Sequence, residues 1–73
     1  MTNKVSPKAL LQSKWTKVEV NNKKEKHFII TKVEFNEDQQ VINCVIEAVM
    51  TKHEYAINWR DLKESNIWLM GWR

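Results

Sequence analysis

Tryptophan is the residue type in this chain that is best suited to specific recognition. The four copies are Trp15, Trp59, Trp68 and Trp72. An indole ring stacks on a nucleic-acid base or fills an apolar pocket of a protein partner, so a group of exposed rings would form a binding surface. Buried tryptophans instead serve as large core residues, and alternation along the predicted strands separates the two roles.

The last apolar segment, residues 67–72, carries two of the four rings. Trp68 and Trp72 share one face of a strand here, whereas Ile67 and Leu69 share the other. Both faces are therefore apolar. If Ile67 and Leu69 enter the core, Trp68 and Trp72 point outward.

The same alternation assigns the two remaining tryptophans. Trp15 points outward if Val18 and Val20 point into the core. Trp59 shares a face with Tyr55 and is predicted to be a core residue whose indole N–H finds a partner near the rim.

A binding platform is the functional interpretation of the outward rings. Its predicted members are Trp15, Trp68 and Trp72, with Lys14, Lys17 and Lys26 supplying positive charge nearby. The structural interpretation is that the N-terminal turn folds over these rings through Leu10 and Leu11 and forms a second small core. The pattern supports both interpretations about equally.

Residue types that support catalysis or metal binding are few and badly spaced. His27, His53 and Cys44 do not form the short paired spacings of a zinc site. Cys44 lies in an apolar file, where burial would raise the pKa of its thiol and make it a poor nucleophile. Gly71 is the only glycine, so a glycine-rich phosphate loop is absent. The sequence predicts no catalytic residue, no metal site and no cofactor.

Charge and length limit the class of protein. Residues 1–32 hold eight lysines against two glutamates, a net charge of +6, and residues 33–73 carry −3. The basic half could attract nucleic acid or an acidic partner, although +3 overall is far below the charge of a dedicated nucleic-acid binder. The 73 residues allow one domain, 1–73, with no membrane span and no secretory signal, so we expect a cytoplasmic protein.

Turn residues and apolar alternation divide the chain into short elements. A helical turn is expected at 7–12 within an N-terminal segment 1–13, a solvated loop at 21–26, and a single 3-10 or α turn at 60–65 that buries Leu62. The strands are predicted at 14–20, 27–35, 41–50, 53–59 and 67–72.

The strongest strand signal is at residues 41–50. Ile42, Cys44, Ile46 and Ala48 stand at alternate positions and are predicted to be buried. A helical stripe also fits this segment, but five β-branched residues in ten favour a strand.

Together these elements predict an all-β fold. We expect a five-stranded antiparallel meander over residues 14–72, curled into an SH3-like barrel with consecutive strands as neighbours. This element order is an analogy with small barrels that bind peptides or nucleic acids, and it favours a binding module over an enzyme.

Several segments also resemble a known family. PKALLQSKWT, KEKHFIITKV and IEAVMTKHEYAINWRDLKESNIWLMGW contain a leucine pair before SKWT, a KHF element, a W-R-x-L-K element and a terminal W-x-x-G-W. This combination is similar to a small tryptophan-rich family of bacterial conserved hypothetical proteins. The resemblance implies a bacterial cytoplasmic protein and supplies no activity, cofactor or site residue.

Two functions follow as hypotheses. The first is a non-enzymatic module that docks a protein or peptide on the tryptophan-rich face. The alternative is binding of RNA or single-stranded nucleic acid by the same face, with the N-terminal lysines on the phosphates.

Overall fold

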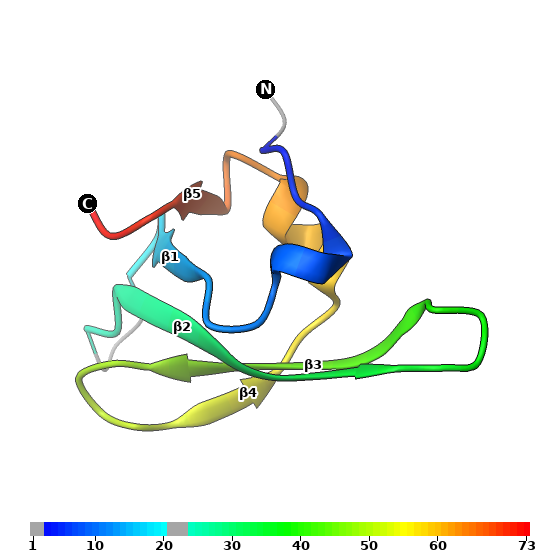
Figure 1. Cartoon of the computed structure of the whole chain (residues 1–73). Helices are drawn as coiled ribbons and strands as arrows, with labels where there is room; N and C mark the ends of the chain where they lie inside the picture. Colours follow the sequence, from blue (N-terminus) through cyan, green and yellow to red (C-terminus); the bar gives the residue numbers. More distant parts are fainter. Residues whose placement is uncertain (1–2, 21–23) are drawn as a thin grey trace.

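The computed structural model describes residues 3–20 and 24–73 as one five-stranded antiparallel sheet with two short 3-10 helices (Figure 1). The elements are η1 (Pro7–Ala9), β1 (Lys14–Lys17), β2 (His27–Phe35), β3 (Val41–Ala48), β4 (Glu54–Ala56), η2 (Trp59–Lys63) and β5 (Trp68–Met70). The all-β prediction is confirmed, and 41–48 forms a strand and not a helix. Residues 21–23 of the predicted solvated loop lie outside the described residues.

β2 and β3 form a long hairpin whose far end projects beyond the other strands (Figure 1). Both strands are rich in β-branched residues, which suit a pleated, half-buried surface. Asn36 closes the turn, because its Oδ1 accepts hydrogen bonds of 2.9 Å from the backbone N–H groups of Asp38 and Gln40. Gln39 takes the left-handed backbone angle of the turn, with φ of 63°. Polar turn residues thus replace glycine here.

The predicted closure into a barrel is wrong. The strand order is β4-β3-β2-β1-β5, so β4 and β5 are the two edges of an open sheet. β5 does not follow the meander but pairs with β1, where Trp15 lies opposite Met70. The helix η2 makes this crossing possible. The side chain of Asn58 caps the helix by accepting a hydrogen bond from the Arg60 N–H, and Leu62 of the helix is fully buried.

A single hydrophobic core lies on the face of the sheet that the N-terminal segment and η2 cover. Its buried members are Leu10, Trp15, Phe28, Ile30, Cys44, Ile46, Ala48, Leu62 and Trp68. Half-buried Trp59 packs against this core. Three of the four residues predicted as buried in β3 are confirmed.

Ile42 is the exception, because its side chain is 62% exposed. The register of the hairpin shifts at this point: Asn43 pairs with Glu34 and Val41 pairs with Phe35, so Ile42 is the extra residue of a β-bulge. A bulge interrupts the alternation from which burial was predicted. Within the described residues, no helix is long and apolar enough to cross a membrane.

Candidate functional site

Two of the three predicted platform rings are buried. Trp15 is 2% exposed and Trp68 is 4% exposed, so their expected outward positions are wrong. Trp68 packs edge to face on Phe28 with ring centroids 5.2 Å apart, and Leu10 joins the same core. The N-terminal turn therefore covers these rings, although within a single core and without Leu11, which is 56% exposed.

The physical reason for this error is the early end of β1. Alternation predicts that Val18 and Val20 face the core, but β1 stops at Lys17 and both valines are exposed. Trp15 lies directly opposite Phe28 in the sheet and so shares its core face.

Trp72 alone remains an exposed tryptophan of the predicted platform, with 44% of its surface accessible. Its indole N–H donates to the backbone oxygen of Phe28 at 2.9 Å, which fixes the ring over β2. The ammonium of Lys14 stands 4.8 Å from the ring centroid, and the His27 ring lies 6.0 Å away. The ring is thus held in place between the ammonium of Lys14 and the imidazole of His27.

The turn after β5 places Trp72 in this position. Gly71 has φ of 77°, a left-handed angle that favours glycine, and its N–H donates to the oxygen of Lys14. The Thr16 hydroxyl donates to the oxygen of Gly71 at 2.7 Å and accepts from the N–H of Arg73 at 2.9 Å. The chain end is therefore anchored to β1 on both sides of the ring.

Further cations continue this surface. The oxygen of Arg73 lies 2.9 Å from His27 Nε2, and a cavity of about 250 Å³ beside His27 is lined by Lys24, Lys26, Val49 and Met50 without a carboxylate. Together, six residues form the Trp72 patch: Lys14, Lys24, Lys26, His27, Trp72 and Arg73. Of the predicted site residues, it unites Trp72, Lys14 and Lys26.

Lys17 lies outside the Trp72 patch. Its ammonium lies 4.7 Å from the centroid of Trp68, on the core side of the sheet. The predicted set of six residues is therefore divided between the exposed patch and the core.

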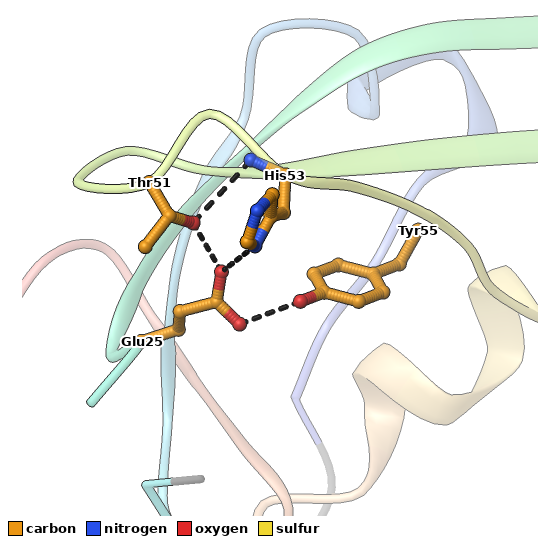
Figure 2. Close-up of polar contacts among 4 residues, drawn as sticks. All are labelled: Glu25, Thr51, His53 and Tyr55. Atoms are coloured by element: carbon orange, nitrogen blue, oxygen red, sulfur yellow. Dashed lines mark hydrogen bonds and ion pairs between the residues drawn. The ribbon is translucent and has the colours of Figure 1, made fainter. Parts of the chain in front are cut away.

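A buried carboxylate was missed by the sequence reasoning. Glu25 is 1% exposed, whereas the polar residues around it predict a solvated loop. Its Oε1 accepts a hydrogen bond of 2.6 Å from the Tyr55 hydroxyl, and its Oε2 accepts one from the Thr51 hydroxyl and lies 3.1 Å from His53 Nδ1 (Figure 2). No local pattern in the sequence marks this network, because its members come from two distant segments.

The Glu25 network joins the segment before β2 to the turn between β3 and β4. The hydrogen bond to Glu25, assisted by burial, raises the pKa of Tyr55 above its ordinary value of 10.0, so this hydroxyl stays protonated at neutral pH. The Thr51 hydroxyl is used as a donor to the carboxylate, and Cys44 lies in the core, where burial raises the pKa of its thiol. Neither group is arranged as an activated nucleophile, and the network acts as a tether.

A metal centre is not visible in residues 3–20 and 24–73, which contain no group of three or more His, Cys, Asp or Glu side chains able to hold an ion.

The fold and the Trp72 patch define a small all-β protein that carries a basic, aromatic surface. The chain belongs to the family described as tryptophan-rich protein (DUF2389), which matches residues 13–73 and whose function is unknown. The resemblance to a tryptophan-rich family is thereby confirmed. Neither the curated proteins nor the solved structures contain a match to the chain.

Proposed function

We propose that the protein is a non-enzymatic binding module that holds single-stranded nucleic acid on the Trp72 patch. The proposal rests mainly on the exposed ring of Trp72. Its indole N–H is hydrogen-bonded to the backbone oxygen of Phe28, and the ammonium of Lys14 lies 4.8 Å from the ring centroid. A base can stack on such a ring while the adjacent cations contact the phosphates.

Docking of a protein or peptide on a broad tryptophan face receives less support. The burial of Trp15 and Trp68 removes most of the apolar area that this interaction would use. What remains exposed around Trp72 is rich in cations, and a partner with regularly spaced negative charge matches it best.

The module character is supported by the order of its elements. The fold has five strands, a 3-10 helix before the last strand, and β5 beside β1. This order is compatible with the SH3-like small folds that serve as binding modules, and the likeness is part of the proposal. A cytoplasmic location is proposed with it, supported by the single cysteine, which is free and buried.

Anisotropy of a fluorescent ten-nucleotide oligouridine measures the proposed interaction. The Trp72→Ala variant should bind about 5- to 150-fold more weakly, the loss that corresponds to one stacked base. The logarithm of the binding constant should fall with the logarithm of the salt concentration with a slope of about −2 to −3, because three or four cations would each displace a counterion.

Two lysines offer a matched control. Lys14 and Lys63 each stand 4.8 Å from a tryptophan ring, but Lys63 lies over Trp59, outside the Trp72 patch. Lys14→Met should weaken binding and Lys63→Met should not. Equal effects of the two changes would contradict the site. Binding of polyglutamate as tightly as the oligonucleotide would reject nucleic acid as the ligand and indicate an acidic protein.

A further inference from the structure

We propose a second binding site that takes an alkylammonium group, such as a quaternary amine or a methylated lysine side chain. The site is a cavity of about 240 Å³ that is lined by residues of all five strands, among them the rings of Phe28, Tyr55 and Trp68. These three rings are called the aromatic cage below. This inference is independent of the proposed nucleic-acid function, since the cage lies on the core side of the sheet and Trp72 is not part of it.

The rings of the aromatic cage stand at steep angles to each other. Phe28 and Trp68 are 5.2 Å apart with an interplanar angle of 87°, and Phe28 and Tyr55 are 6.4 Å apart at 60°. All three rings line the cavity, and each ring face carries negative electrostatic potential that attracts a cation. The geometry therefore suits a rounded, positively charged group.

Lys17 already shows that the cage accepts an ammonium. Its side chain lines the cavity, and its Nζ lies 4.7 Å from the Trp68 centroid, within the range of a cation–π contact. Lys17 stands opposite Trp68 in the β1–β5 pairing, so its flexible stem can leave the ring without a change in the sheet. We regard Lys17 as an internal occupant that an external cation displaces.

Negative charge at the cavity strengthens this assignment. Glu19 and Glu25 also line it, and the carboxylate of Glu25 binds the hydroxyl of Tyr55 at 2.6 Å. The side chain of Glu25 is fully enclosed, so it acts on a ligand through its field and not through a direct ion pair.

Size and chemistry define the preferred ligand. The volume is below the roughly 300–1,000 Å³ typical of drug-sized ligands, which limits the site to one side chain or a small amine. Ile46 and Ile57 supply apolar walls. A quaternary ammonium has no N–H groups to satisfy and loses less hydration than a primary amine, so methylated amines should bind best.

Titration with choline tests the site, with 3,3-dimethylbutan-1-ol as its uncharged isostere. The indole N–H resonance of Trp68 in a ¹H–¹⁵N spectrum reports occupancy directly. In the Lys17→Met variant choline should shift this resonance with an affinity about tenfold higher than in the wild type, because the tethered competitor is gone. The isostere should have no comparable effect.

Lys63→Met is the matched control, since it removes the same charge from above another tryptophan ring, that of Trp59, which does not line the cavity. It should leave the choline-induced shift of the Trp68 resonance at the wild-type level. The proposal is overturned if choline and its isostere shift Trp68 equally, or if folded Lys17→Met protein shows no shift. Comparison with N-acetyl-trimethyllysine amide separates the two sources: tighter binding of the amide indicates a partner's side chain, and tighter binding of choline indicates a free amine.

Discussion

Replacement of Trp68 by alanine should lower the free energy of unfolding by about 3–5 kcal/mol, the range for truncation of a buried tryptophan. Trp68 is 4% exposed, packs edge to face on Phe28 at 5.2 Å, and holds the ammonium of Lys17 over its ring. Truncation removes all three contributions and leaves a cavity in the only core of the described chain.

Trp72 provides the comparison, four residues along the chain. Its ring is 44% exposed, and its replacement by alanine removes one hydrogen bond to the Phe28 oxygen and the contact with Lys14. These losses correspond to about 1–2 kcal/mol, because water reaches the groups that are left behind.

Urea denaturation followed by circular dichroism measures both changes. A 73-residue domain has a total stability of about 4–11 kcal/mol, so the Trp68→Ala protein should be partly unfolded without denaturant or have a strongly lowered midpoint. Trp72→Ala should keep a cooperative transition close to the wild type. Trp68→Phe, which retains a ring against Phe28, should lie between the two. Equal midpoints for Trp68→Ala and Trp72→Ala would refute the assignment of one ring to the core and the other to the surface.

Three further predictions concern the core and the tether. Ile46→Ala should cost about 2–5 kcal/mol, whereas Ile42→Ala on the exposed bulge should stay within about 0.5 kcal/mol; a similar loss in urea titrations of both would contradict the bulge. Burial raises the pKa of Cys44 above 9.0, and the hydrogen bond to Glu25 raises that of Tyr55 above 10.0. The folded state favours both protonated forms, so their contribution to the free energy of unfolding is complete below pH 9 and is lost as the pH rises first past 9 and then past 10. Urea midpoints at pH 8 and pH 10.5 measure this loss. An unchanged midpoint would argue against it. Glu25→Gln replaces one acceptor by a donor and should destabilise by about 1–3 kcal/mol, with faster amide exchange at residues 24–26; a variant as stable as the wild type would show that the carboxylate does not tether this segment.

The sequence by itself determined the elements that depend on local pattern. β2 begins and ends at the residues predicted from β-branched content and the polar turn at Asn36. The alternation in β3 identified Cys44, Ile46 and Ala48 as core residues, because a strand buries every second side chain wherever its register is regular. The turn that buries Leu62 was also predictable, since one apolar residue stands between polar neighbours.

Only the tertiary structure decided which face each tryptophan occupies. Trp15 and Trp68 are buried because β5 returns to pair with β1, a contact between segments more than 50 residues apart that no local periodicity encodes. The bulge at Ile42 reverses burial at one position for the same kind of reason, since it depends on the partner strand. Glu25 is enclosed by Thr51, His53 and Tyr55, and its polar neighbours in sequence gave no sign of this. Burial of a polar group requires partners, and when these come from a distant strand only the folded chain can show them.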